Sequence, residues 1–468
     1  MFKLFNHYLP IRTALLAALE AVVLFQSVIL GFRIRLPGEG LAAPYIEAAF
    51  FTVIMLISMS GLGLYQSHAE RFRVTLIRLV LACTVSLLLS IALFYLVPGT
   101  YLGRGVMAFT SVFALAGLML VRLLFTKVTD IGLPKRRVLV LGNGTDADQV
   151  IKFLGTGHAG RNVEFAGLYP VGQAGRAPSA NSPDPGAPNP TNPEPPAESL
   201  MAALERLNVS EVVIATRERR GGVLPLAQLL EARLQGFRVM DLPSFYEREA
   251  GVLTIESMRA SWMIFGGGFD QSLGRDLVKR VFDLLVSLAL LIISLPVLVL
   301  AALAIVIESG TPIFYSQIRV GQGGKTFRIT KLRSMRQDAE ADGQPRWATV
   351  NDQRITRVGD LLRKTRIDEL PQLWSVLKGD MSFVGPRPER PEFVKTLSEQ
   401  IPFYDARHSL KPGVTGWAQV RYWYGGSVED STRKLEFDLY YVKNHSFFLD
   451  LLILIETIQV VLLGKGAR

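Results

Sequence analysis

Four apolar stretches near the amino terminus constrain this 468-residue chain more than any other feature. Each holds about 20 predominantly apolar residues, which is the length that an α-helix needs to cross a hydrocarbon core about 30 Å thick. The mean hydropathy of the whole chain, +0.28, is high for a soluble protein. The sequence therefore predicts a membrane protein whose residues 1–130 form a four-helix transmembrane bundle, with helices at 11–31, 46–65, 75–97 and 106–125.

Basic residues flank these four helices unevenly. Lys3, Arg12 and six further lysines and arginines fall on one side, whereas only Arg33, Arg35 and Arg104 fall on the other. Because cytoplasmic flanks are enriched in Lys and Arg, both ends of the bundle are predicted to be cytoplasmic. Within the first helix, Glu20 is expected to turn into the bundle and to be neutral or hydrogen-bonded, although an ionisable group at that depth can also mark a functional pathway.

The charge of the chain limits its partners. A formal net charge of +10 and a pI near 9.6 suit nucleic acid, an anionic membrane surface or phosphate-bearing substrates. The apolar helices favour the last two, so no nucleic-acid partner is predicted. A single cysteine, Cys83, excludes an intramolecular disulfide and a cysteine-based metal cluster. The five histidines have no metal-ligand spacing, so a zinc mechanism is not supported.

Residues 131–260 alternate between strand and helix patterns. A buried strand at 137–142 is followed by the turn Gly142-Asn-Gly144 and an amphipathic stretch to Leu154. This order predicts a Rossmann-like α/β cytosolic domain with a parallel sheet and helices on both faces. Further strands are predicted at 163–168, 211–215 and 237–240, and helices at 199–207 and 224–234.

The purpose of this domain is less clear from its residues. No acidic residue follows the second strand to hold a ribose hydroxyl, which favours a domain without a catalytic dinucleotide. The alternative is a nucleotide-sugar oxidoreductase or epimerase centred on Gly142 and Gly144, which tightly bound NAD would reveal. An insertion at 174–198 holds eight of the chain's 25 prolines, all of them after residue 177, and is predicted to be disordered.

Two later apolar stretches are predicted not to span the membrane. Residues 281–307 are almost wholly apolar, but a crossing there would carry the basic remainder of the chain to the other side. Pro296 should kink the helix, and Ser294 could bond carbonyls that the bend frees, so a re-entrant hairpin at 279–308 is predicted, with a straight span as the alternative. Residues 447–463 contain Asp450, Glu456 and Gln459, which indicates an amphipathic helix lying at the interface.

The adjacent carboxylates Asp368 and Glu369 are the candidate chemical centre. They follow a basic turn that contains Arg363 and Arg366. Neighbouring carboxylates repel unless cations neutralise them, and Mg²⁺ is often held by one or two carboxylates together with substrate phosphates. A carboxylate can attack phosphorus, while Arg363, Arg366, Arg387 and Lys331 are available to hold phosphoryl oxygens. The alternative is a solvated acidic pair at a helix end.

Several motifs stand in a fixed order over about the last 190 residues. They are Lys279-Arg-Val-Phe-Asp283, Lys331-Leu-Arg-Ser-Met335, Asp368-Glu369, Gly385-Pro-Arg-Pro388 and Lys411-Pro-Gly-Val-Thr-Gly416. In them the chain resembles the bacterial sugar transferase family, the monotopic polyprenyl-phosphate hexose-1-phosphate transferases that initiate exopolysaccharide and O-antigen repeat units. The upstream bundle and Rossmann-like domain look like those of the larger members. Two departures are Leu295, where serine usually precedes the hairpin proline, and Ser375, where asparagine is common.

The resemblance implies a mainly α catalytic domain at 275–468 that contains the re-entrant helix 279–308. It also implies that Asp368 is the nucleophile of a phosphosugar-enzyme intermediate, that UMP is released, that Glu369 binds Mg²⁺ and that Arg387 contacts phosphate. The Lys331 motif, including Arg333, is expected to contact phosphate as well. Asp352 and Arg354 match the family pattern and would position metal or nucleotide, unless they form only an ion pair; Lys411 is a further supporting residue.

The implied partners are a UDP-hexose donor, a polyprenyl phosphate acceptor and membrane lipids. The implied location is the bacterial cytoplasmic (inner) membrane, with the catalytic domain on the cytoplasmic face, and the bundle could support a homodimer. A non-enzymatic membrane subunit of a polysaccharide assembly machine is the alternative, for which Asp368→Ala would leave function intact. The sequence does not predict which hexose is carried, because a few hydroxyl contacts decide it.

Overall fold

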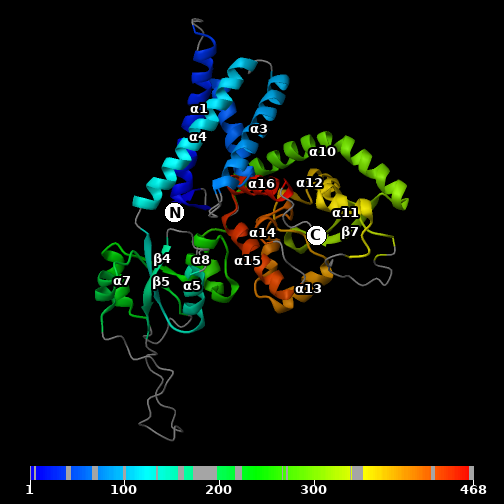
Figure 1. Ribbon diagram of the computed structural model, residues 1–468. Coiled ribbons are helices and arrows are strands. Elements are labelled where there is room, and N and C mark those ends of the chain that lie inside the picture. The colour runs from blue at the N-terminus through cyan, green and yellow to red at the C-terminus, as the bar shows by residue number, and fades with distance from the viewer. Residues whose placement is uncertain are drawn as a thin grey trace. The chain divides into compact units, whose positions relative to one another are not determined.

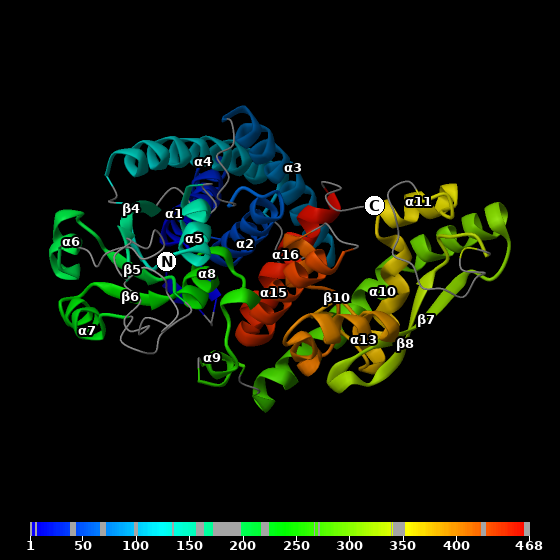
Figure 2. The ribbon, with the colours of Figure 1, turned by 90° about the horizontal axis from the view of Figure 1, so that it is seen from below.

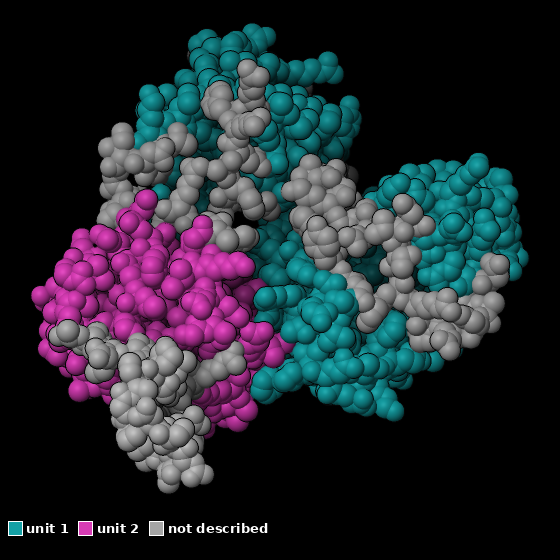
Figure 3. All heavy atoms as spheres, turned by 60° about the horizontal axis from the view of Figure 1, so that its bottom comes forward, with its two compact units in different colours: residues 1–130, 268–468 teal, residues 131–267 magenta. Residues whose placement is uncertain are grey.

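The computed structural model divides the chain into two compact units, residues 1–130 with 268–468 and residues 131–267 (Figure 3). The second unit thus extends to Gly267, beyond the predicted boundary at 260. Apart from Glu198, the predicted proline-rich insertion lies outside the described residues. The structure describes residues 2–4, 7–37, 44–65, 72–97, 102–132, 135–155, 163–171, 198–216, 224–265, 267–269, 272–337, 339, 352–422 and 427–462.

The amino-terminal part of the first unit is a short hairpin followed by four helices (Figure 1). The hairpin is β1 (Phe2–Leu4) and β2 (His7–Leu9), and the helices are α1 (Ile11–Arg35), α2 (Tyr45–Gly61), α3 (Phe72–Leu96) and α4 (Arg104–Gly132). Among the residues that the structure describes, four helices are long and apolar enough to cross a membrane by length and composition: α1, Val74–Tyr95 of α3, Arg104–Phe125 of α4 and the later α10 (Leu273–Ser309).

Helix α2 ends earlier than the sequence pattern predicts. It has 17 residues and stops at Gly61, so the predicted span 46–65 is wrong at its carboxyl end. The reason is local, because Gly63 adopts a φ of +76° that lies in the left-handed region, and the Leu64 N–H donates to the carbonyl of Met59 at 3.0 Å. At 1.5 Å per residue the helix is about 26 Å long, near the lower limit for a span.

The bundle encloses Glu20 as expected. Its core contains the fully buried Leu24, Val28 and Met55. The Glu20 carboxylate is also fully buried and accepts hydrogen bonds from Arg122 Nε on α4 and from the Tyr65 hydroxyl, both at 2.6 Å. Glu20 is therefore a paired group inside the bundle, which confirms the expectation that it turns inward and is hydrogen-bonded.

The carboxyl-terminal part of the first unit is mainly helical with two small sheets. One sheet is an antiparallel ribbon, and the other is a parallel pair in which Thr415 lies opposite Val384. The elements after α10 are β7 (Phe314–Val320), η3 (Gln322–Gly324), β8 (Thr326–Leu332), α11 (Arg357–Lys364), η4 (Ile367–Gln372), α12 (Leu373–Lys378), β9 (Ser382–Val384), α13 (Pro391–Gln400), η5 (Tyr404–Ser409), β10 (Gly413–Thr415), α14 (Trp417–Arg421), α15 (Val428–Asn444) and α16 (Phe447–Leu462).

Helix α10 is continuous over 37 residues, with Pro296 inside it, and is bowed rather than broken (Figure 1). The carbonyl that Pro296 deprives of a backbone donor belongs to Ile292. The Ser294 hydroxyl donates instead to the carbonyl of Leu291 at 3.3 Å, so it does not supply the partner that the sequence suggested for the freed carbonyl. The re-entrant hairpin stays a prediction.

Both ends of α10 contact the same carboxyl-terminal domain. Near its start, Arg280 donates to the carbonyl of Val376 at 2.6 Å, and Asp283 accepts from the Phe383 N–H at 3.1 Å. Near its end, the Glu308 carboxylate accepts from the first backbone N–H groups of α11, and Ile305 packs in a cluster with residues of β8 and α11. The residues between the two contacts expose large apolar side chains, among them Ile293, which is 73% exposed.

Helix α16 differs from the amphipathic interfacial helix that the sequence predicts. Its polar residues face the protein: Asp450 and Gln459 are 2% and 3% exposed, and Glu456 pairs with Arg421. Asp450 accepts from Lys279 Nζ at 2.6 Å and from the Tyr441 hydroxyl at 2.7 Å. The polar residues of α16 thus face partners that are distant in sequence and not water, while the interfacial location of the helix stays a prediction.

The second unit is a four-stranded parallel sheet in the order β4-β3-β5-β6, as the alternating pattern predicts. Leu139, Leu141 and Val212 pack against α6 and α7, while α5 and α8 lie across the sheet from α7 (Figures 1 and 2). The elements are β3 (Arg136–Leu141), α5 (Thr145–Gly155), β4 (Val163–Tyr169), α6 (Leu200–Arg206), β5 (Glu211–Ile214), α7 (Leu226–Leu234), β6 (Arg238–Asp241), α8 (Leu242–Ala250), η2 (Ile255–Ser257) and α9 (Ala260–Phe265).

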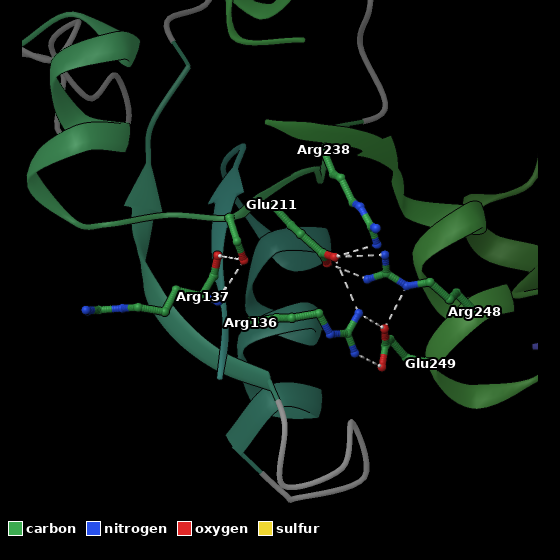
Figure 4. A network of polar contacts seen from close by, with 7 residues as sticks. Arg136, Arg137, Glu211, Arg238, Arg248 and Glu249 are labelled. Carbon is green, nitrogen blue, oxygen red and sulfur yellow. Dashed lines mark hydrogen bonds and ion pairs between the residues drawn. The ribbon is translucent and has the colours of Figure 1, made fainter. Parts of the chain in front are cut away.

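A charge network joins the amino ends of three of these strands to α8 (Figure 4). Arg136, Glu211 and Arg238 are the first residues of β3, β5 and β6. Glu211 is 1% exposed and pairs with Arg248 of α8 at 2.5 Å, and Arg136 pairs with Glu249 at 2.9 Å. Ligands of such sheets bind at the opposite, carboxyl edge, so this network is structural.

Candidate active site

The carboxylates Asp368 and Glu369 lie in η4, which follows a short capped helix. The Thr356 hydroxyl caps α11 by accepting from the Gly359 N–H at 2.9 Å. Gly359 is required there because a Cβ atom would lie 2.0 Å from the carbonyl oxygen of Ser334, in the segment that follows β8. This close packing sets α11, and therefore η4, against the strand that carries Lys331.

Arg366 makes the sharp turn between α11 and η4. Its φ and ψ are 58° and 15°, the left-handed conformation that residues other than glycine adopt at a cost of about 1–2 kcal/mol. Its Nη1 atom lies 3.9 Å from Glu369 Oε1. An arginine at a position that favours glycine indicates that its side chain is needed there.

Glu369 is buried and surrounded by cations. Its Oε1 atom accepts from Lys331 Nζ at 2.8 Å and from Arg387 Nη2 at 2.9 Å. Burial alone would raise the pKa of Glu369, but the charges of Arg387, Lys331 and Arg366 hold it well below its ordinary value. Burial also lowers the pKa of Lys331, which the charge of Glu369 opposes. Glu369 is therefore a stable carboxylate.

Asp368 is in a different environment although it is the next residue. It is 7% exposed, and its Oδ1 atom has no hydrogen-bond partner among the described residues. Burial and the negative charge of Glu369 raise its pKa, while Lys331, Arg366 and Arg363 lower it. Two neighbouring carboxyl groups whose pKa values are pushed apart are typical of sites where the two have different roles.

Arg387 is held in place through its backbone as well as its side chain. It follows β9, whose parallel pairing with β10 brings the Gly385 N–H to the carbonyl of Thr415 at 2.9 Å. Arg407 donates to the Arg387 carbonyl at 2.9 Å and pairs with the buried Asp438 at 2.7 Å. The Arg387 guanidinium thus reaches Glu369 from a loop that is fixed on two sides.

The predicted site residues fall into two groups. In the structure Lys331, Arg366 and Arg387 form ion pairs with Glu369, and Arg363 acts on Asp368 through its charge. Arg333 instead donates from Nη2 to the carbonyls of Ser309 and Gly310, at the carboxyl end of α10. Its phosphate-binding role stays a prediction, because these bonds direct that nitrogen to the helix end.

The predicted supporting residues lie in other surroundings. Asp352 and Arg354 form an ion pair with each other at 2.5 Å, and this pairing lowers the pKa of Asp352 to about 2. Lys411 is near Gly379, and its pKa is lowered by burial and by the charge of Arg280 at the start of α10. These residues make contacts that hold the fold around the site, and their effect on metal or nucleotide stays a prediction.

Three residues of the site region, Gln419, Arg407 and Asp438, were not predicted. Gln419 accepts from Arg387 Nη1 at 2.9 Å, so it holds the guanidinium opposite Glu369. Gln419 lies two residues after Trp417, at the end of the segment that begins with the Lys411 motif, and this closeness to a family motif was the available sign of a role in the site. Arg407 and Asp438 had no such signal, because their pairing joins η5 to α15 across 31 residues of sequence.

The two carboxylates fit a shared magnesium site. Within the described part of the chain no group of three or more His, Cys, Asp or Glu side chains could hold a metal by itself. Mg²⁺ typically takes only one or two protein carboxylates and completes its shell with water and substrate phosphate. The unpartnered Oδ1 atom of Asp368 is a donor of the required kind, so Asp368 and Glu369 would hold the ion together with the substrate.

The arrangement can bind and attack a phosphorylated substrate. The cations are Lys331, Arg363, Arg366 and Arg387, and the carboxylates are Asp368 and Glu369. Together they carry a formal charge of +2, which suits a diphosphate. The ionised Asp368 is a nucleophile of the kind that forms acyl phosphates. Arginine guanidinium groups match phosphoryl oxygens in geometry and charge.

Comparisons with known proteins agree with this arrangement. Residues 274–464 match the family described as "Bacterial sugar transferase". The UDP-N-acetylgalactosamine-undecaprenyl-phosphate N-acetylgalactosaminephosphotransferase of Aeromonas hydrophila is 47% identical over 41% of this chain and 45% of its own length. The "Uncharacterized sugar transferase EpsL" of Bacillus subtilis is 41% identical over 41% of this chain and 91% of its own length.

A third relative is named for a different donor, UDP-glucose. The UDP-glucose:undecaprenyl-phosphate glucose-1-phosphate transferase of Caulobacter vibrioides is 44% identical over 41% of this chain and 72% of its own length. The match thus covers most of the two shorter relatives but less than half of the Aeromonas protein. In each of these three cases it covers about two fifths of this chain.

Proposed function

Because the chain belongs to the bacterial sugar transferase family, we propose that it moves a hexose 1-phosphate from a UDP-hexose to a polyprenyl phosphate such as undecaprenyl phosphate. The observation that carries this proposal is the buried Asp368 carboxylate, with a free oxygen, beside a Glu369 that is neutralised by Lys331 and Arg387. The names of the relatives, which specify UDP-sugars and undecaprenyl phosphate, support the donor and acceptor classes.

The chemistry follows from these residues. An oxygen of Asp368 attacks the phosphorus that bears the sugar, and the bond from that phosphorus to the bridging oxygen breaks, so that UMP leaves. A polyprenyl phosphate oxygen then attacks the same phosphorus, the bond to Asp368 breaks, and the product is a polyprenyl diphosphate sugar. Both steps balance without a proton donor, and the covalent intermediate splits one displacement into two.

The cations hold the phosphoryl oxygens as the charge moves. Arg366, Arg387 and Lys331 surround the carboxylates, and preformed cationic donors stabilise the developing charge without reorganisation. When bound by Asp368 and Glu369, Mg²⁺ would neutralise the diphosphate and make UMP a better leaving group. Glu369 keeps its negative charge through its low pKa, so it can serve as a metal ligand at neutral pH.

The location proposed for this reaction is the cytoplasmic face of a bacterial inner membrane. Both ends of α10 contact one domain, which supports a helix that enters and leaves by the same face. The exposed apolar residues between the ends, such as Ile293, would lie in lipid. The lipid acceptor and the soluble donor then meet at one surface, as the first step of exopolysaccharide or O-antigen synthesis requires.

The test uses purified full-length protein with Mg²⁺, undecaprenyl phosphate and a panel of UDP-hexoses, and it follows UMP release. We expect one or two donors to be used and Asp368→Asn to reduce turnover by at least a thousandfold. Asp360→Asn is the matched control, because this exposed carboxylate lies in the neighbouring α11 and pairs only with Lys364 among the described residues. Full turnover of Asp368→Asn would refute the proposal.

A labelled donor separates the covalent mechanism from direct transfer. With donor alone, we expect label on the protein of the parent chain and none on Asp368→Asn. Turnover without label on any acidic residue would remove the intermediate but keep the overall reaction. For topology, a reporter fused after Gly310 is expected to be cytoplasmic; a reporter on the opposite side would establish a straight span.

A further inference from the structure

The amino-terminal hairpin reaches the catalytic part of the chain through one buried side chain. His7, the first residue of β2, is 7% exposed. Its Nδ1 atom lies 2.8 Å from the hydroxyl of Tyr440 on α15, which is 433 residues away in sequence. The imidazole also meets the ring of Trp417 on α14 edge-on, with the ring centroids 5.7 Å apart. The reaction steps described above make no use of this histidine.

The His7 ring is an uncharged anchor. Burial and the positive charge of Arg421 lower its pKa to about 4, so the imidazole is neutral at physiological pH. A neutral imidazole has one nitrogen that accepts a hydrogen bond, so Nδ1 can accept from the Tyr440 hydroxyl. The edge-on approach to Trp417 is a preferred arrangement of two aromatic rings. Both contacts attach the hairpin to the two elements that flank the site.

The helix that His7 contacts depends on its neighbours for its position. Helix α14 has five residues, and an isolated helix of that length is not stable in water. Two of its supports come from the catalytic domain. The ring of Tyr440 is stacked on Trp417 with the centroids 5.9 Å apart, and Arg421 pairs with Glu456 on α16. The amino-terminal hairpin is a third support, through His7.

Helix α14 also carries a side chain of the candidate active site. Gln419 lies two residues after Trp417 and accepts from Arg387 Nη1 at 2.9 Å. The Nη2 atom of the same guanidinium donates to Glu369, also at 2.9 Å. A shift of Trp417 would therefore move the acceptor that orients Arg387. A misplacement of about 1 Å can cost an enzyme about a hundredfold in rate, even when its cause is far from the chemistry.

We propose that His7 is a positioning residue for the transfer reaction, which holds α14 and thereby keeps Gln419 and the Arg387 guanidinium in place beside Glu369. This inference rests on the proposed function, because it assigns His7 a role in that same reaction. Since β2 directly precedes α1, the same contact links the membrane bundle to the catalytic domain. A hairpin with only a structural role would change unfolding but not the turnover of the folded enzyme.

Steady-state UMP release by the purified full-length protein tests this role. For His7→Ala we expect kcat to fall about tenfold and the KM for the UDP-hexose to change less than about twofold, because Arg387 acts on charge that develops in the transition state. His7→Phe keeps a ring beside Trp417 but loses the acceptor, so it should fold like the parent chain and have an intermediate kcat. Lys3→Ala, at an exposed position of β1, is the control in the same hairpin and should leave kcat unchanged.

A double variant shows whether His7 acts through Gln419. If it does, His7→Ala combined with Gln419→Ala should turn over about as fast as Gln419→Ala alone, because the two changes remove one shared contact. The proposal would be overturned if the two losses multiplied. It would also be overturned if His7→Ala and His7→Phe kept the parent kcat while only their unfolding temperatures fell. A parent chain that releases no UMP with any donor would overturn the proposed function and this inference together, whereas an active parent with unaffected His7 variants would overturn this inference alone.

Discussion

The left-handed backbone at Arg366 gives a prediction in which the order of stability of the glycine and alanine variants is opposite at positions 366 and 360. Both Arg366→Ala and Arg366→Gly remove the cation 3.9 Å from Glu369, but only glycine relieves the strain at φ 58°. The strain of a left-handed alanine is about 1–2 kcal/mol. The greater freedom of glycine in the unfolded chain offsets about 0.5–1 kcal/mol of that.

The net expectation is that Arg366→Gly is more stable than Arg366→Ala by about 0.5–1 kcal/mol, or about 2 °C in unfolding temperature. Asp360 is the matched control, because it lies in α11 and its side chain is 53% exposed. There, Asp360→Gly should be less stable than Asp360→Ala by about 1 kcal/mol, since glycine is the poorer helix former.

Thermal unfolding of the four variants in one detergent measures both differences, and UMP release measures the function of the charge. Arg366→Lys keeps both the charge and the strain, so it should retain more activity than either neutral variant. If Arg366→Ala were as stable as Arg366→Gly, the turn would not be strained. If the neutral variants turned over like the parent chain, the side chain would have no role in the reaction.

Three further predictions concern stability, pH and backbone packing. Glu211→Ala leaves the buried Arg248 with one fewer partner, and should lower the unfolding free energy of the second unit by about 3 kcal/mol, measured by limited proteolysis at increasing denaturant. The Asp352–Arg354 pair should contribute stability fully above pH 4 and lose it as pH falls from 3.8 to about 2, because the folded pKa is depressed; unfolding of the parent and of Asp352→Asn should converge over that range. Gly385→Ala places a Cβ atom 2.3 Å from a backbone carbonyl, and should reduce UMP release at least tenfold.

Each of these has a control on the same chain. Glu231→Ala, at an exposed position of α7, should change stability by less than about 0.5 kcal/mol. Gly274→Ala has open space at its Cβ position and should leave UMP release unchanged. The role of Glu211 would be contradicted if Glu211→Ala changed the stability of the second unit as little as Glu231→Ala. The role of Asp352 would be contradicted if Asp352→Asn did not alter the pH dependence of unfolding.

Periodicity and local motifs predicted much of the fold. The strands from 137 to 240 were located within a residue or two, because buried strands bounded by turn residues carry their own signal. The adjacency of Asp368 and Glu369, and their approach by Lys331 and Arg387, followed from charge neutralisation and from the family motifs. Here the sequence and the structure agree because the interacting residues are adjacent in the sequence or belong to recognisable motifs.

The interactions that sequence reasoning missed are long-range. The buried polar face of α16 could not be inferred, since Asp450 is satisfied by Lys279, 171 residues away. The sequence motif that contains Lys331 and Arg333 also gave no sign that Arg333 donates to the Gly310 carbonyl at the end of α10. Partners that only the tertiary fold brings together decide which cation meets which anion.

The pairing of Glu20 with Arg122 has a consequence for how the chain can be made and shortened. The acidic residue emerges from the ribosome 102 residues before its basic partner, so α1 must wait beside the translocation machinery, or in lipid, with an unmatched carboxyl group. In truncations that keep α1 but omit α4, the Glu20 carboxyl group would permanently lack its basic partner Arg122. Expression designs should therefore retain the whole bundle or remove it entirely.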